Sequence, residues 1–98
     1  MKKYFVSIMS TMYSIYIHKK PSLKYNGYTD TAKKEIHIFN NKKRKTETLA
    51  HELIHAFLFE CGHDGFCRNE TLVHALGRFF EKLFEVYSKL VLELEERD

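Results

Sequence analysis

The sequence predicts an α+β fold, a small domain in which a short three-stranded sheet packs on one central helix and a long C-terminal helix. Strand-like alternation of apolar residues is confined to the first 39 residues, and helical spacing of apolar residues runs through most of the remainder. The chain shows no linker and no repeat, so residues 1–98 are expected to form a single domain. A hydrophobic content of 44% supports a folded chain rather than a disordered one.

Three strands are expected in the N-terminal part of the chain. In the second of them, Tyr13, Ile15 and Ile17 alternate onto one face, as in a half-buried strand. Pro21 ends this strand, and the Asn-Gly pair at 26–27 marks a turn. The expected strands are 4–8, 12–18 and 35–39.

Two helices are expected after the strands. The first runs over 46–61, where Gly62 ends it, and it follows a loop that contains the basic run at 42–45. The second runs over 70–95, and Asn69 is its candidate N-cap. The order of elements is therefore strands first and helices second, which is typical of an α+β domain.

The second helix carries an apolar stripe whose members recur at threes and fours, while charged residues occupy its other faces. We interpret the stripe as core packing; the alternative is a surface for a partner helix where the end of the helix outruns the small domain. The stripe comprises Leu72, Val73, Leu76, Phe80, Leu83, Tyr87, Leu90, Val91 and Leu94.

The first helix contains His51-Glu52-Leu53-Ile54-His55, the arrangement of metal ligands and base in zinc peptidases. Because residues four apart stack on one face of a helix, both imidazoles can reach one metal ion while Glu52 reaches its water. The flanking residues are mostly apolar, so the helix is expected to be enclosed by protein. A metal then removes the cost of unpaired buried polar groups, roughly 1 to 3 kcal/mol each. The alternative is two exposed or hydrogen-bonded histidines on an ordinary helix.

A catalytic zinc ion takes a third protein ligand and keeps its fourth position open for water. The strongest candidate is Glu70, which would lie in the first turn of the second helix behind Asn69 and point back at the first helix. His63, His74 and Cys61 are the alternatives for this position.

The chain resembles the gluzincins, the thermolysin-like zincins, over roughly residues 26–80. The resemblance lies in the order of three features: the motif, a short loop and an Asn-Glu pair at a helix start. Their third ligand is a Glu in an Asn-Glu-x-x-x-Asp segment. His74 stands at the position of that Asp, which supports a zinc-ligating His, and an imidazole brings no negative charge there. The layout of 26–30, 35–38 and 48–52 is also similar to short zincins encoded by phages and prophages of Gram-positive bacteria.

Two other zincin classes share the motif but differ in the third ligand. Metzincins require Gly and His seven and ten residues after the first His, where this chain has Leu58 and Cys61, so that class fits poorly. The loop 62–66 resembles that of SprT-like zincins, which are associated with nucleic acids and whose third ligand is a His, here His63.

The gluzincin resemblance implies a zinc metallopeptidase in which Glu52 is the catalytic base. It also implies that an extended peptide or protein substrate pairs with the edge strand before the motif helix, here Ile36 to Phe39. Within that strand, His37 is expected to face solvent. The residues that would hold Zn²⁺ are His51, His55 and Glu70.

The cellular location expected from the sequence is the cytoplasm. The N-terminus begins with two lysines, as signal peptides do, but polar residues interrupt the apolar run and no cleavage site follows. No stretch approaches the ~20 apolar residues of a membrane span. Cys61 and Cys67 are expected to be reduced thiols; a structural zinc site formed with His63 is the alternative, but it would lack a fourth ligand.

Two further functions are alternatives to peptidase activity. Nucleic-acid binding through the basic run 42–45 is disfavoured because the net charge is only +3 and no aromatic residue interrupts the run. A zinc-binding interaction module without turnover is the stronger alternative, because His74 replaces the supporting Asp.

Overall fold

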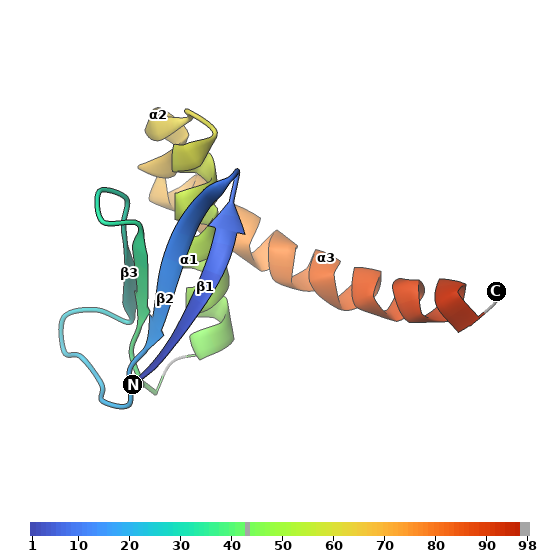
Figure 1. Ribbon diagram of the computed structural model, residues 1–98, viewed down its shortest axis with the longest axis horizontal. Helices are drawn as coiled ribbons and strands as arrows, with labels where there is room; N and C mark the ends of the chain where they lie inside the picture. The colour runs from blue at the N-terminus through green and yellow to red at the C-terminus, as the bar shows by residue number, and fades with distance from the viewer. Residues whose placement is uncertain (43, 97–98) are drawn as a thin grey trace.

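The computed structural model describes residues 1–42 and 44–96, and its α+β fold confirms the predicted class. A sheet lies against α1, while α3 crosses α1 and continues away from the sheet (Figure 1). The strands are β1 (Lys2–Ile8), β2 (Thr11–Ile17), β3 (Gly27–Asp30) and β4 (Glu35–Ile38). The helices are α1 (Lys45–Glu60), α2 (Asp64–Cys67) and α3 (Glu70–Glu96).

The sheet has four strands in the order β1-β2-β4-β3, one more than the sequence predicted. β1 and β2 form an antiparallel hairpin, β4 pairs in parallel with β2, and β3 pairs antiparallel with β4. The prediction that residues 36–39 form the edge strand is therefore wrong, because β4 lies between β2 and β3. The edge strand next to the motif helix is β3.

The additional strand begins at the Asn-Gly pair that predicted only a turn. Its four residues are too few to show a clear alternation of apolar and polar positions. Gly27 is required there, because a Cβ atom would lie 2.7 Å from the carbonyl oxygen of His37 on β4. Gly27 therefore marks a close approach of two strands and not a loop.

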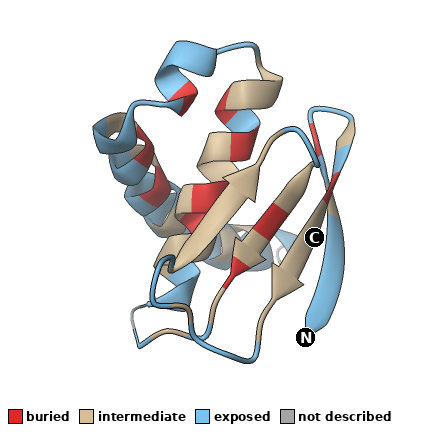
Figure 2. Ribbon diagram, turned by 90° about the vertical axis from the view of Figure 1, so that its left-hand side faces the viewer, coloured by how far each residue is buried: buried red, intermediate tan, exposed pale blue. Residues whose placement is uncertain are grey.

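The main core lies between the sheet and α1 (Figure 2). Tyr13 and Ile36 are fully buried there, and Ile15 and Ile17 pack on the same cluster. This confirms the predicted face of the second strand. The buried members of this cluster are Ile8, Tyr13, Ile36, Ile38 and Ala56, and Leu49 and Leu53 of α1 pack against them.

A polar contact closes one end of this core. The hydroxyl of Tyr13 donates a hydrogen bond of 2.6 Å to Glu60 Oε2, and the ammonium of Lys34 lies 2.7 Å from the same oxygen. These partners, Lys34 first, hold the pKa of the Glu60 carboxyl below its ordinary value of 4.5. Burial and the same contact raise the pKa of Tyr13. The ionised carboxylate therefore stabilises the fold.

This contact predicts acid sensitivity. A carboxyl whose pKa is lower in the folded state stabilises the protein above its unfolded pKa and loses that contribution as the pH falls through the folded pKa. We expect the free energy of unfolding to fall as the pH drops below about 4.5, and Glu60→Gln to flatten this dependence and to cost about 1 to 2 kcal/mol at neutral pH. Urea titrations between neutral and acidic pH measure both effects. An unchanged pH profile in the variant would contradict the assignment.

The opposite face of the sheet carries stacked rings. The His37 ring stacks on Tyr16 at a centroid distance of 4.7 Å and on Tyr28 at 4.6 Å. Its Nδ1 lies 2.8 Å from Nε2 of His18, and burial is the main cause that lowers the pKa of His18. The prediction that His37 simply faces solvent is wrong, because neighbouring strands cover its ring and leave 13% of the side chain exposed.

A second, smaller core joins α1 to α2 and α3. Its buried members are Leu58, Cys67 and Val73, one from each helix. Gly77 faces the backbone of His51, and a Cβ atom at this glycine would lie 3.3 Å from the His51 Cα and N atoms. The absence of a side chain therefore lets the two helices cross closely at the motif.

The apolar stripe of α3 is core only at its N-terminal end. Leu72, Val73 and Leu76 are wholly or partly buried. From Phe80 onward the stripe is exposed, apart from the half-buried Val91. The core interpretation is wrong for this second part, because Glu81 of α3 already pairs with Arg44, where α1 begins. The remaining helix thus extends past α1. None of the helices formed by residues 1–42 and 44–96 combines the length and apolar character needed to cross a membrane.

Candidate metal centre

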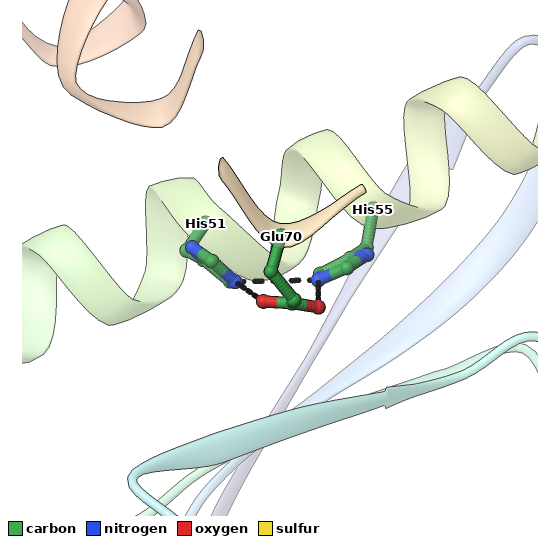
Figure 3. Close-up of side chains that lie close together, drawn as sticks. All are labelled: His51, His55 and Glu70. Carbon is green, nitrogen blue, oxygen red and sulfur yellow. Dashed lines mark hydrogen bonds and ion pairs between the residues drawn. The ribbon is translucent and has the colours of Figure 1, made fainter. Parts of the chain in front are cut away.

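The two histidines of the motif lie one turn apart on α1 and turn their rings to the same side (Figure 3). Their Nε2 atoms are 3.2 Å apart. Both side chains are mostly buried, with 21% of His51 and 15% of His55 exposed. The helical spacing alone accounts for this convergence.

The third predicted ligand comes from α3. One carboxylate oxygen of Glu70 lies 3.0 Å from His51 Nε2, and the other lies 3.0 Å from His55 Nε2. The position of Glu70 follows from the start of the helix, where the Asn69 side chain accepts a 3.0 Å hydrogen bond from the Leu72 backbone N–H. The predicted N-cap is therefore present, and it sets the first turn from which Glu70 reaches α1.

The side chains of His51, His55 and Glu70, which we call the metal-ligand group, fit a divalent metal such as zinc. Their ligand atoms lie within 4.8 Å of one another. Tetrahedral zinc with ligands at about 2.0 to 2.1 Å would hold any two of them about 3.3 Å apart, so the separations of 3.0 to 3.2 Å need only small adjustments. Glu70 is 68% exposed, so the group opens toward solvent on its side.

The alternative ligands are not in this group. Among the residues that the structure describes, His51, His55 and Glu70 form the group that meets the geometry, without His63 or Cys61. His63 is exposed next to α2, and its ring contacts Phe66. His74 is nearer, with its ring centroid 6.2 Å from that of His51, and it lines the adjacent cleft.

The carboxyl of Glu52 lies between α1 and the edge strand. It is 8% exposed, and its Oε1 accepts a 2.8 Å hydrogen bond from the hydroxyl of Thr29 on β3. Burial is the largest effect and raises the pKa of Glu52, while the Thr29 hydrogen bond and the neighbouring histidines oppose it. A raised pKa makes a carboxylate a better proton acceptor.

Cys67 supports the ring of His55 from behind. Its Sγ lies 3.7 Å from Nδ1 of His55 and 3.2 Å from the backbone oxygen of the same residue. Burial raises the pKa of the Cys67 thiol, which favours its neutral form. Cys61 is also a free thiol, so the predicted reduced state of both cysteines agrees with the structure.

The group lies in an open cleft of 970 Å³ between β3 and the three helices. Gly27, Tyr28 and Thr29 line the strand side, and Glu52 and the metal-ligand group line the helix side. An extended chain placed along β3 would therefore run past the metal-ligand group. The sequence does not predict Thr29 as a site residue, because Thr29 belongs to no spaced motif. It predicts Cys67 only as a reduced thiol or as a ligand of the alternative structural zinc site, and not as a contact of His55.

The close crossing at Gly77 predicts a strong dependence of metal binding on one glycine. Gly77→Leu would push α3 away from the His51 backbone and draw Glu70 out of ligand distance. We expect a fall in zinc affinity of about tenfold or more and a loss of about 1 to 3 kcal/mol in stability. Zinc titration and thermal unfolding measure the two effects. Ala75→Leu, at an exposed position of the same helix, is the control and should leave zinc affinity unchanged.

Comparisons of the chain with protein-family models, with curated proteins and with solved structures gave no match.

Proposed function

We propose that this protein is a zinc-dependent metallopeptidase. The observation that carries the proposal is the convergence of His51, His55 and Glu70 from two helices, with the buried carboxyl of Glu52 beside them in the same cleft. Two imidazoles and one carboxylate are the ligands of a catalytic zinc ion, which keeps one position for water or substrate.

The roles of the residues follow from their placement. When bound, zinc supplies Lewis acidity, which lowers the pKa of water and polarises a carbonyl. Glu52 accepts the proton of the attacking water and returns it to the leaving amine, and its raised pKa suits both transfers. Thr29 keeps the carboxylate oriented, because its hydroxyl also donates to the backbone oxygen of Glu52 at 3.0 Å.

The substrate we propose is an extended stretch of peptide. β3 lies at the edge of the sheet and lines the cleft, so its outer side can form main-chain hydrogen bonds with an added strand. Binding of this kind depends little on side chains and suits flexible or unfolded segments. The free thiols of Cys61 and Cys67 fit a reducing compartment, and we propose the cytoplasm.

Two ion pairs of Arg44 argue against nucleic-acid binding through the basic run at 42–45. Arg44 lies 3.7 Å from Glu47 and 3.3 Å from Glu81, so its charge is compensated within the protein. Lys43 lies outside the described residues. The interaction module without turnover is the alternative that the test below separates from the peptidase.

The experiment measures metal content and cleavage on the same preparation. We expect about one zinc ion per chain, and cleavage of some members of an unstructured peptide library, detected by mass spectrometry. A chelator should abolish cleavage, and added zinc should restore it. Bound zinc without any cleavage would instead support the interaction module. A folded protein that binds no zinc would overturn both.

A further inference from the structure

The last 15 described residues of α3, 82–96, form a segment that we call the projecting segment. It projects away from α1 and the sheet (Figure 1). At about 1.5 Å per residue, the projecting segment is about 22 Å long. Its large apolar side chains lie exposed; Tyr87 and Leu94 are each 64% exposed, and Phe84 is 62% exposed. A helical end with so much exposed apolar surface gains little stability from packing within its own chain, which favours a partner that covers it.

The spacing of these side chains is that of a coiled coil. From Val73 onward, apolar residues alternate at intervals of three and four along the whole of α3. The first members of this series pack on α1, and the later members have no such cover in the exposure pattern. The series comprises Val73, Leu76, Phe80, Leu83, Tyr87, Leu90 and Leu94.

The exposed area is large enough for a stable interface. The apolar side chains along the face of the projecting segment are Leu83, Phe84, Val86, Tyr87, Leu90 and Leu94, and they are 45% to 64% exposed. With about 200 Å² for each whole side chain, they present on the order of 700 Å². That exceeds the largest patch of a typical monomer, about 300 to 600 Å², and approaches the ~800 Å² that each partner buries in a specific complex.

We propose that the projecting segment pairs antiparallel with the same segment of a second copy of this chain. In this arrangement Leu83 of each copy faces Leu94 of the other, and Tyr87 faces Leu90. These contacts are the same for both chains, as a two-fold axis requires. The same register places Glu95 and Glu96 of one copy beside Lys82 of the other. A parallel pair would bring the two acidic tips together.

The charges of the segment argue against a lipid surface as the occupant. Residues 82–96 contain two lysines and four glutamates, so the polar side is acidic. Helices that lie on anionic membranes are instead rich in Lys and Arg on the polar side.

The length of the segment also suits the pair, because two copies overlap fully with one domain at each end of the interface.

The test is the mass of the full chain in solution. We expect sedimentation equilibrium to give twice 11.7 kDa at tens of micromolar chain, and Leu90→Glu to give a monomer. Leu92→Glu is the matched control, because Leu92 lies on the opposite side of the helix and is also exposed; it should remain a dimer. Circular dichroism verifies that each variant is folded.

A charge exchange tests the orientation. Glu95→Lys with Glu96→Lys should weaken the dimer at least fivefold, and adding Lys82→Glu should restore it. A monomer at every concentration, including one that then sediments with anionic vesicles, would overturn the proposal. A larger assembly, or a dimer equally weakened by Leu92→Glu, would overturn the two-chain antiparallel arrangement. These outcomes do not depend on peptidase activity.

Discussion

We expect Glu52→Gln to retain zinc but to lose cleavage by about 10²-fold to 10⁴-fold. The amide occupies the same volume and still accepts the hydrogen bond from Thr29, so the fold and the metal-ligand group stay in place. It cannot take a proton from water, and general acid–base catalysis contributes a factor of this size. The measurement is kcat on a peptide found in the library, together with zinc content by elemental analysis.

The matched control for this change is Glu47→Gln. Glu47 lies on the same helix and lines the same cleft, but it pairs with Arg44 and is not in the metal-ligand group. Its replacement should change kcat by less than about twofold, as expected for a surface ion pair. If Glu52→Gln cleaved as fast as the original protein, the assigned base would be wrong, whereas loss of zinc from that variant would make Glu52 a ligand.

The second large effect is on metal affinity. Glu70→Ala removes one of the three proposed protein ligands. We expect zinc affinity to fall more than about a hundredfold, since loss of an outer supporting partner alone costs about 10- to 100-fold. The thermal stabilisation by zinc should fall with it, because a ligand stabilises only in proportion to its binding. Competition with a chromophoric chelator measures the affinity directly.

His63→Ala is the control that separates the two ligand assignments. His63 is exposed and contacts Phe66, so its loss should leave zinc affinity unchanged. The opposite result, in which His63→Ala loses zinc and Glu70→Ala keeps it, would assign the third ligand to the loop after α1. Glu85→Ala, on the exposed polar side of α3, controls for the removal of a negative charge from the same helix.

The sequence predicted the features that depend on spacing. A separation of four residues brings His51 and His55 together on any α-helix, and Asn69 caps the helix from which Glu70 points back. Alternation placed Tyr13, Ile15 and Ile17 on the core side of the sheet. These predictions succeeded because each rests on local geometry that the rest of the fold does not change.

The predictions that were wrong concern features that depend on tertiary contacts with distant parts of the chain. Residues 27–30 form an edge strand, but four residues and an Asn-Gly pair resemble a turn when their pairing partner is unknown. The spacing of apolar residues in α3 shows which face of the helix is apolar. It does not show where the cover by α1 ends, which is near Glu81. The contact between Thr29 and Glu52 joins residues 23 apart in sequence, and no motif encodes it.

The crossing at Gly77 divides α3 into two parts of unequal length. The part from Gly77 to Glu70 is about 10 Å long, and the part from Gly77 to Glu96 is about 28 Å long. If α3 tilts as a rigid rod, a swing of about 3 Å at the tip displaces the Glu70 end by about 1 Å, enough to change a coordination distance. A partner bound to the C-terminal end of α3 would therefore also change the position of the Glu70 carboxylate.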